Sequence, residues 1–228
     1  MKYKLPSNWK YAKIKEIADI DTETISEDTD PNYRFKYITL GDVNKGKISD
    51  ELSECSFEEA PSRARRVIKK DDIIIGTVRP NLQAFAYIEK NIKDVIVSTG
   101  FAVISPRECV NGKYLYQFLY SEYIKWQLYT LIVGSSYPAI NSDDVANLKI
   151  LLPPHEEQQK IADIFSLYDF AIKKIEQLII MKEEYKKAII QQMFDKRKIV
   201  KGINLEISNI LSVVKREDDG KKIWELCT

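Results

Sequence analysis

The sequence has one histidine, His155, and only three cysteines among its 228 residues. Catalytic triads and histidine-containing metal sites place histidine among partners from elsewhere in the chain, whereas His155 follows a proline at a predicted helix start and suits a surface or capping role. The cysteines, Cys55, Cys109 and Cys227, lie far apart, unlike zinc ligands or a secreted disulfide framework. The sequence therefore predicts no metal site and a reducing compartment.

Glycine is also scarce, with eight residues and no glycine-rich loop that could cradle a phosphate group. The segment Asp30-Pro31-Asn32-Tyr33 has the wrong residue order for the base-holding loop of a DNA methyltransferase, and we interpret it as a turn. Glu184-Tyr185-Lys186 lies inside a predicted helix, away from any strand of a nuclease site. These absences predict a binding protein without cofactor or catalytic residues.

Excess charge and long apolar runs are missing as well. The net charge is +1, and basic and acidic residues balance on both sides of Pro154, so any nucleic-acid surface must be a local patch. No stretch approaches the ~18 to 20 apolar residues that span a bilayer, and residues 1–6 contain no apolar signal segment. We expect a cytoplasmic protein without membrane contact.

Short β-branched and aromatic runs separated by turn residues fill the first hundred positions, which is typical of strands. They predict a twisted β-sheet, with strands at residues 37–40, 73–75, 84–88 and 95–104. A tight turn is expected at Asn44-Lys45-Gly46-Lys47, since asparagine and glycine tolerate positive φ.

Helical spacing replaces this pattern between Asn111 and Val133, where one packed helix is expected. A loop, a short turn and the apolar run 148–152 follow, and Pro153-Pro154 ends the predicted domain. The prediction is an α+β fold with three parts, namely a globular domain at 1–154, a long helix at 155–199 and an unassigned tail at 200–228.

The long helix carries a wide apolar stripe over about five heptads, with no glycine or proline before Gly202. Such a helix, roughly 60 Å long, is expected to form a coiled coil with a partner helix. A core helix folded back on the domain is the alternative. The predicted partner-facing residues are Ile161, Ile164, Tyr168, Ile172, Ile175, Leu178, Ile179 and Ile189.

Three groups of segments, in this order, resemble the specificity subunits of Type I restriction-modification systems. The similarity extends over nearly 200 residues, and its most specific part is the junction Pro153-Pro154-His155-Glu156-Glu157-Gln158. The matching segments are residues 5–9 with 17–20, residues 71–80 with 98–101, and residues 137–141 with 148–162.

The resemblance implies a target-recognition domain that reads one half of a split double-stranded DNA site, and a spacer helix that docks a modification (methyltransferase) subunit. Methyltransferase activity, and any nuclease of a restriction subunit, would belong to partners. Family members usually carry two domains and two helices, whereas this sequence has one of each. We therefore expect a half-subunit that pairs with a second copy through antiparallel long helices, and such a homodimer favours a palindromic split site.

The densest basic cluster is the leading candidate for phosphate contact, because phosphate neutralisation supplies much of the affinity for DNA. It consists of Arg63, Arg65, Arg66, Lys69 and Lys70. A solvated charged loop is the alternative interpretation.

Base reading is expected from Arg79, Asn81 and Gln83, whose side chains can pair with guanine or adenine edges. A buried structural arginine is the alternative for Arg79. Lys45 in the tight turn, and Ser136 and Tyr137 in the loop after Gly134, are further candidates for DNA contact.

Two other functions fit the same domain-plus-helix pattern. A coiled-coil adaptor would use the helix to bind a protein partner, and the balanced charge favours it. A decoy subunit would occupy modification subunits without productive DNA reading. Retention on duplex DNA in the presence of a modification subunit separates both from a DNA reader.

Overall fold

The computed structural model describes residues 6–131 and 138–194. The chain forms two compact units, residues 1–166 and 167–228, and the long helix α5, His155–Phe194, crosses from one to the other. The α+β class predicted from the sequence is confirmed. Within the described ranges, no helix combines the length and the apolar character that crossing a bilayer requires.

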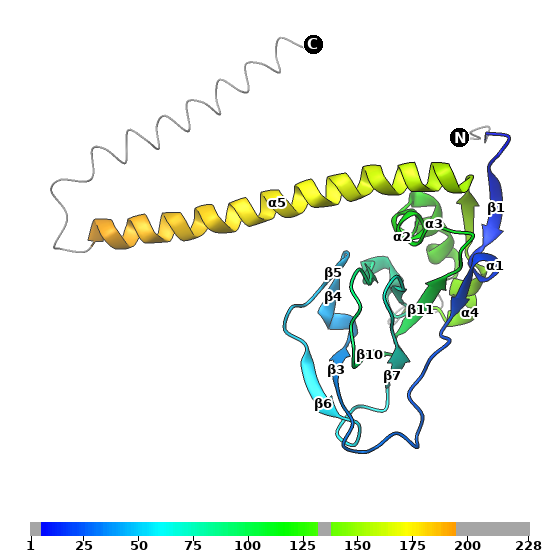
Figure 1. Ribbon diagram of the computed structural model, residues 1–228, viewed down its shortest axis with the longest axis horizontal. Coiled ribbons are helices and arrows are strands. Elements are labelled where there is room, and N and C mark those ends of the chain that lie inside the picture. The colour runs from blue at the N-terminus through cyan, green and yellow to red at the C-terminus, as the bar shows by residue number, and fades with distance from the viewer. Residues whose placement is uncertain (1–5, 132–137, 195–228) are drawn as a thin grey trace, which may run out of the picture. The chain divides into compact units, whose positions relative to one another are not determined.

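The first of two four-stranded sheets has the strand order β6-β3-β10-β7 (Figure 1). The central strand β10 runs parallel to β3 and antiparallel to β7, and β6 is antiparallel to β3. The strand bounds are β3 Arg34–Ile38, β6 Ser53–Ser56, β7 Ala64–Val67 and β10 Val95–Ser98.

The second sheet is antiparallel throughout, in the order β2-β11-β8-β9. Its bounds are β2 Ala18–Ile20, β8 Ile73–Gly76, β9 Phe85–Tyr87 and β11 Phe101–Pro106. The run 95–104, which we predicted as one strand of one sheet, therefore supplies a strand to each sheet. The chain changes sheets at Gly100, where an added Cβ would lie 3.0 Å from the side chain of Leu40.

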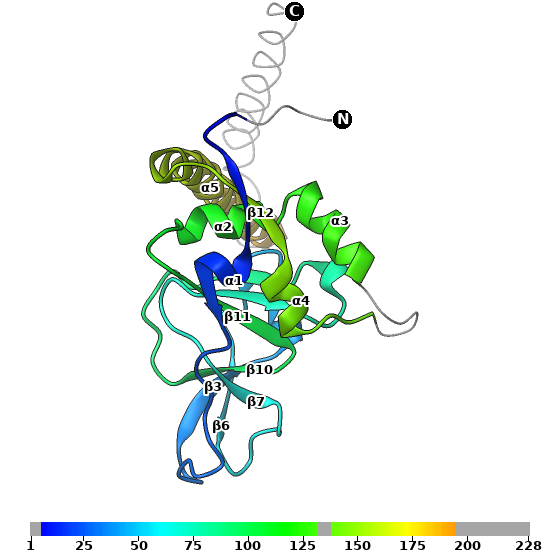
Figure 2. The ribbon, with the colours of Figure 1, turned by 90° about the vertical axis from the view of Figure 1, so that its right-hand side faces the viewer.

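The two sheets pack face to face, and helices cover the other face of the second sheet (Figure 2). Strand β8 shows this layering, because Ile73 and Ile75 join the helix-side core while Ile74 joins the core between the sheets. All three are fully buried. A strand covered on both faces explains why this run is continuously apolar rather than alternating.

Four short helices form the covering layer. Their bounds are α1 Ile14–Ile17, α2 Gly112–Phe118, α3 Glu122–Leu131 and α4 Ser142–Asn147. The prediction of one helix over 111–133 is wrong, because the chain turns between α2 and α3. The hydroxyl of Ser121 accepts a hydrogen bond from the amide of Ile124 (3.3 Å) and so begins a new helix there.

The beginning and the end of the domain lie side by side. Strand β1, Lys10–Lys13, pairs antiparallel with β12, Lys149–Leu152, and α5 starts shortly after β12. Just before β1, the side chains of Asn8 and Trp9 donate to the carboxylate of Glu157 (2.7 and 2.8 Å). The first turn of α5 is thus held by the segment that opens the domain.

A buried glutamine fixes the same turn from the other side. The side chain of Gln158 is 1% exposed, donates to the carbonyl of Pro153 (2.8 Å) and accepts from the amide of Asn111 (2.8 Å). Ala162, one turn further on, belongs to the helix-side core. Through Pro153, Glu157 and Gln158, the segment Pro-Pro-His-Glu-Glu-Gln therefore fixes the first turn of α5 to the domain.

Candidate nucleic-acid interface

Four chain segments from distant parts of the sequence meet where strands of both sheets begin or end. The amide of Thr99 donates to the carbonyl of Arg63, and the amide and hydroxyl of Thr77 donate to the carbonyl of Gly100, all at 2.8 Å. The carbonyl of Thr77 accepts from the amide of Ile140 (2.9 Å). We call this set of hydrogen bonds the Thr77 junction. It gives the loops that leave it a fixed base.

The loop 79–83 leaves this junction and contains the 3-10 turn η2, Pro80–Leu82. Its first residue is tied down, because the amide of Arg79 donates to the carbonyl of Pro138 (2.7 Å). Arg79 and Gln83 flank the turn with positive φ angles of 50° and 54°. Each such conformation costs a non-glycine residue about 1 kcal/mol or more, and such strain concentrates at functional sites.

The three predicted base readers all belong to this loop. The structure leaves Arg79 and Asn81 exposed and Gln83 half-buried. The alternative of a buried Arg79 does not hold for this conformation. The loop therefore brings together side chains that can pair with base edges on a rigid backbone.

Lys45 lies in the two-residue turn between β4, Val43–Asn44, and β5, Lys47–Ile48. Positive φ angles occur at Gly46 (88°), as expected for a glycine, and at Lys45 (44°) rather than at Asn44. The amide of Gly46 donates to the carbonyl of Phe85 (2.9 Å), at the start of β9. This bond brings the exposed Lys45 close to the end of the η2 loop.

Arg63 and Arg65 lie at the start of the edge strand β7. Arg63 is exposed, and Arg65 is half-buried with its guanidinium 5.2 Å from the centre of the Phe57 ring. The guanidinium of Arg65 also donates to the carbonyl of Ala64 (2.9 Å). Both arginines remain accessible from solvent, as a phosphate contact requires.

Arg66 points inward instead. Its guanidinium pairs with the carboxylate of Asp21 (2.8 Å) and donates to the hydroxyl of Ser142 (3.1 Å), with 15% of the side chain exposed. Burial lowers the pKa of Arg66 from its ordinary value, and the charge of Asp21 acts in the opposite direction. This arginine ties β7 to β2 and α4, which favours a structural role.

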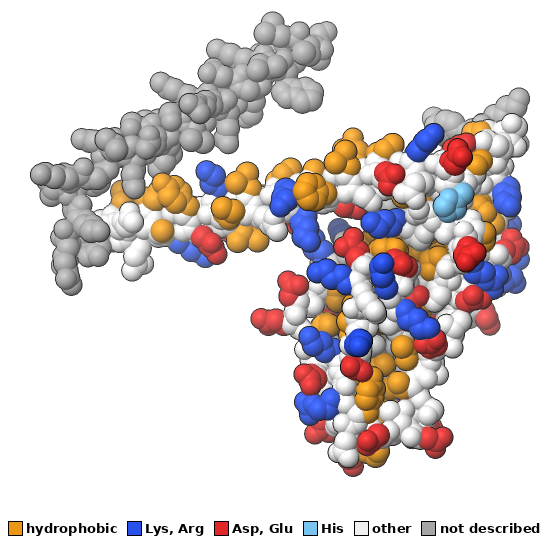
Figure 3. All heavy atoms as spheres, viewed as in Figure 1, with side chains coloured by type: hydrophobic (Ala, Val, Ile, Leu, Met, Phe, Trp, Pro, Cys, Tyr) orange, Lys and Arg blue, Asp and Glu red, His pale blue; other side chains and the backbone are white. Residues whose placement is uncertain are grey.

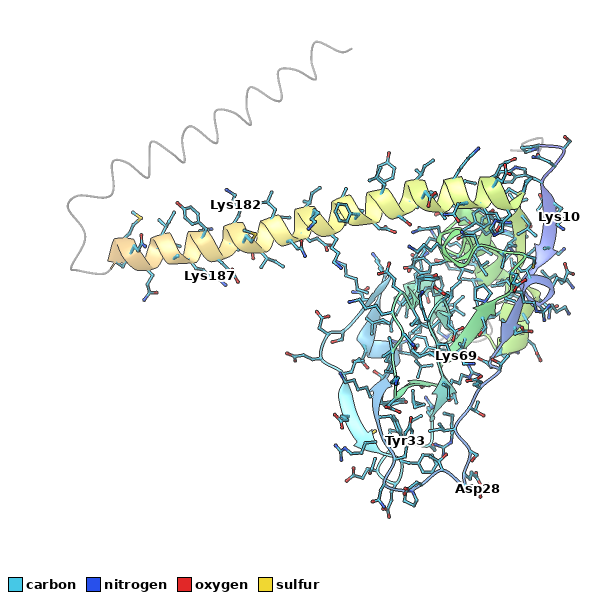
Figure 4. All side chains as sticks on the ribbon, in the orientation of Figure 1. Lys10, Asp28, Tyr33, Lys69, Lys182 and Lys187 are labelled. Carbon is cyan, nitrogen blue, oxygen red and sulfur yellow. The ribbon has the colours of Figure 1, made fainter. Side chains whose placement is uncertain are left out.

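Of the remaining candidates for DNA contact, the structure describes Lys69 but not Ser136 and Tyr137. Lys69, labelled in Figure 4, is exposed and forms an ion pair with Glu23, which raises the pKa of the lysine. A surface pair of this kind exchanges readily with solvent and adds little stability. Ser136 and Tyr137 lie outside the described residues.

Sequence reasoning missed the contribution of α3. A shallow depression beside η2 is lined by Pro80, Asn81, Gln83, Lys125, Leu128 and Tyr129. Tyr129 and Trp126 are 57% and 63% exposed although they are large and aromatic. The sequence did contain a sign of this surface. Trp126 and Tyr129 do not follow the three- and four-residue spacing of the apolar residues that pack α3 against the domain, so exposure of both rings could have been expected.

Charges of both signs are interspersed over the face of the domain in Figure 3. This distribution agrees with the nearly equal numbers of basic and acidic residues. DNA would therefore bind through individual basic side chains rather than through a uniformly positive surface.

A model of the family described as "Type I restriction modification DNA specificity domain" matches residues 6–184. The chain belongs to this family. It is 29% identical over 194 residues to the HindI specificity subunit of Haemophilus influenzae, covering 82% of this chain and 41% of that protein. It is 27% identical over 210 residues to the MjaVIII specificity subunit of Methanocaldococcus jannaschii, covering 88% and 48%.

Solved structures of specificity subunits share the fold. The HsdS subunit from Thermoanaerobacter tengcongensis superposes with a TM-score of 0.68 at 32% identity, covering 83% of this chain and 49% of that one. A chain from a structure of the type I R-M system gives 0.66 at 29% identity, covering 88% and 52%. The chain spans about half the length of the relatives that it matches.

The segments that resemble specificity subunits come together in space. Residues 71–80, 98–101 and 137–141 are separate in the sequence, yet each supplies a member of the Thr77 junction. In this specificity-domain chain the matched residues therefore build the base from which the η2 loop projects.

Proposed function

We propose that this chain is the sequence-recognition subunit of a Type I restriction-modification complex and reads one half of a split double-stranded DNA site. The family match over residues 6–184 carries the proposal, because it spans the domain and most of α5. The chain itself would be non-catalytic. Methyltransferase activity would belong to modification subunits, and cleavage to a restriction subunit, with the assembly acting on cytoplasmic DNA.

In this proposal the exposed loops divide the work of DNA binding. Arg79, Asn81 and Gln83 face base edges from a backbone that the Thr77 junction holds in place. Phosphates are met by a second group of side chains that are exposed or half-buried, namely Arg63, Arg65, Lys69 and Lys45. Arg66 supports β7 from inside. Ser136 and Tyr137 stay candidates from the sequence.

The distal part of α5 supplies the second half of the proposal, pairing with the same helix of a second copy. Its stripe is uncovered, with more than half of the side chain exposed at Ile164, Tyr168, Ile172, Ile175, Leu178 and Ile179. Ile189 is half-buried, and Ile161 packs against the helix-side core of the domain. A row of this length in water calls for a partner helix.

One lysine in the stripe favours the antiparallel arrangement. Lys182 occupies the heptad position of Ile161, Tyr168, Ile175 and Ile189, so a parallel pair in register would place two lysines face to face. An antiparallel pair that crosses near Ile175 instead brings Lys182 level with residues 168 and 169 of the other copy, where residue 169 is an aspartate. The charge pattern supports antiparallel pairing.

A second apolar row supports docking of the modification subunit on the same helix. Leu167, Phe170 and Met181 are 67%, 58% and 64% exposed and lie outside the stripe. Apolar side chains line both edges of α5 visible in Figure 3. Because one partner helix covers only one stripe, the additional row provides room for a second partner.

The first test uses the full chain coexpressed with its modification subunit. Methylome sequencing is expected to recover a new split motif, and a homodimer predicts a palindromic one. Light scattering of the chain alone is expected to give the mass of a dimer at micromolar concentration. A stable monomer would refute the homodimer, and the absence of any new motif would refute DNA reading.

A label on α5 tests the helix direction. Lys187 leaves the helix on a different side from Lys182 (Figure 4). In a chain with Cys55, Cys109 and Cys227 replaced by serine, spin labels at Lys187→Cys would be about 35 Å apart in an antiparallel pair centred near Ile175, from the rise of ~1.5 Å per residue. A separation under about 20 Å would indicate a parallel pair.

The adaptor or decoy remains the second candidate, favoured by the net charge of +1. It predicts a complex with the modification subunit that is not retained on any duplex. Retention of the complex on its own methylated motif, and not on a scrambled duplex, excludes it.

A further inference from the structure

The η2 loop presents three consecutive side chains whose chemistry points to one kind of base pair. Asn81 and Gln83 carry amides, and Leu82 between them exposes 58% of its apolar side chain. Asparagine and glutamine pair bidentately with N6 and N7 of adenine, and apolar side chains pack against the C5 methyl of thymine. Guanine and cytosine offer no methyl group in the major groove.

The amides are available for such pairing. Among the residues that the structure describes, neither the side chain of Asn81 nor that of Gln83 has a hydrogen-bond partner. Both line the depression beside α3, where the ammonium of Lys125 is within 3.0 Å of Glu122 at the surface. Side-chain amides suit base edges, which offer hydrogen-bond donors and acceptors, better than they suit an apolar protein surface.

Backbone hydrogen bonds hold the loop in one conformation, so its side chains project from a rigid base. Within it the amide of Leu82 donates to the carbonyl of Arg79 (2.9 Å), and the amide of Gln83 donates to the carbonyl of Pro80 (3.1 Å). Below the loop the amide of Gly76 donates to the carbonyl of Ala84 (2.9 Å). A rigid backbone reduces the entropy lost on binding, while the strain of the two positive φ angles is already held by the folded domain.

We propose that the η2 loop enters the major groove and selects A·T base pairs, with Asn81 or Gln83 pairing with adenine and Leu82 packing against a thymine methyl. The proposal rests on the proposed DNA-reading function and names the bases that one loop of that surface recognises. Arg79, at the start of the loop, then contacts a neighbouring guanine or a phosphate.

Base analogues test this directly on the complex of the full chain with its modification subunit. The probe is a duplex carrying the motif recovered by methylome sequencing, with each thymine replaced in turn by deoxyuridine, which lacks only the methyl group. One replacement is expected to weaken binding about fourfold, the equivalent of burying one methyl group fewer. Replacing an adjacent adenine by 7-deazaadenine is expected to weaken binding about five- to tenfold.

The variants assign these effects to the loop. In Leu82→Ala the sensitivity to that deoxyuridine disappears, whereas Leu82→Met, an apolar side chain of similar volume, retains it. Asn81→Ala or Gln83→Ala removes the sensitivity to 7-deazaadenine and leaves the deoxyuridine effect in place. Light scattering of each variant complex checks that assembly is unchanged.

The outcomes separate the two levels of the proposal. A wild-type complex that binds the motif, but whose analogue sensitivities are the same in all variants, overturns A·T selection and leaves DNA reading intact. Dissociation of the modification subunit from Leu82→Ala would identify the loop as a protein-docking surface and overturn it equally. A wild-type complex that binds no duplex would refute the proposed function and this inference together.

Discussion

The folded domain buries most of its large apolar side chains, whereas the distal part of α5 leaves them exposed to solvent. The domain buries its isoleucines, valines and phenylalanines in three clusters, and several of them, such as Phe35, Ile74 and Phe101, are at most 1% exposed. Beyond Ser166, α5 leaves side chains such as Tyr168 and Ile175 more than half exposed. The domain has a core of its own, whereas residues 167–194 of α5 present the exposed apolar surface of an unpaired helix within the part of the chain that the structure describes.

The surfaces left for partners consequently differ in kind. On the domain the η2 loop presents the amides of Asn81 and Gln83 with the apolar Leu82, and the exposed ring of Tyr129 from α3 lies beside them. On α5 they are rows of isoleucine, leucine and tyrosine. A rigid surface that combines amides with an aromatic ring suits a nucleic-acid interface, whereas a long apolar row suits a protein helix.

The largest expected effect comes from breaking the apolar row. Replacing Ile172 and Ile179 by aspartate is expected to weaken self-association by at least about 100-fold, because each buried isoleucine contributes about 1.5 to 3 kcal/mol. Sedimentation equilibrium over a concentration series measures the change. Lys173→Asp, which changes an exposed polar position beside Ile172, is the matched control and should leave the dimer intact. Equal weakening by both would contradict pairing through the stripe.

An isoleucine-to-alanine substitution is expected to affect the free energy of unfolding differently in the domain and in the distal part of α5. Ile74→Ala is expected to lower the free energy of unfolding of the domain by about 2 to 5 kcal/mol, because it leaves a cavity between the sheets. Ile175→Ala removes the same atoms from a side chain that is 58% exposed, and should leave domain unfolding within about 0.5 kcal/mol of wild type. Urea denaturation followed by tryptophan fluorescence, in the Ile172→Asp, Ile179→Asp background, measures both.

The sequence predicted those features that depend on local pattern. The apolar runs located β3, β8, β9, β10 and β11, and the uninterrupted stripe located α5, whereas β1, β2, β6 and β7 were not predicted. The sequence did not predict that residues 95–104 divide between two sheets, because the division is set by pairing with strands from elsewhere in the chain, and Gly100, at the change, lies close to the distant Leu40. The break between α2 and α3 was missed as well, since the capping role of Ser121 shows only once Ile124 is known to start a new helix.

The candidate site shows the same limit. Arg63, Arg65 and Arg66 are nearly adjacent and were equivalent as a basic cluster. The alternation of a strand sends Arg66 inward to Asp21, which lies far earlier in the chain, and no local pattern predicts that partner. The η2 loop was found because its residue types are distinctive, but its strained backbone and its anchor at Pro138 required the structure.

A smaller effect on domain stability is expected to distinguish Arg66, which points inward, from Arg65 in the same strand. Arg66→Ala is expected to destabilise the domain by about 1 to 3 kcal/mol, because Asp21 would keep a mostly buried charge without its cation. Arg65→Ala, in the same strand, should stay within about 0.5 kcal/mol. Combining Arg66→Ala with Asp21→Ala in a double-mutant cycle isolates the pair, and additive effects would show that the two side chains are not coupled.

The smallest expected effect concerns the outer surface of the domain. Arg63→Ala and Arg65→Ala together are expected to flatten the plot of log K against log salt by roughly one unit for each phosphate that is no longer neutralised, without changing stability. Fluorescence anisotropy on the methylated motif, from low to physiological salt, gives the slope. Lys113→Ala removes an exposed cation from α2, in the helix layer, and should leave the slope as it is. If Lys113 changes the slope and the two arginines do not, the DNA lies against the helix layer rather than beside β7.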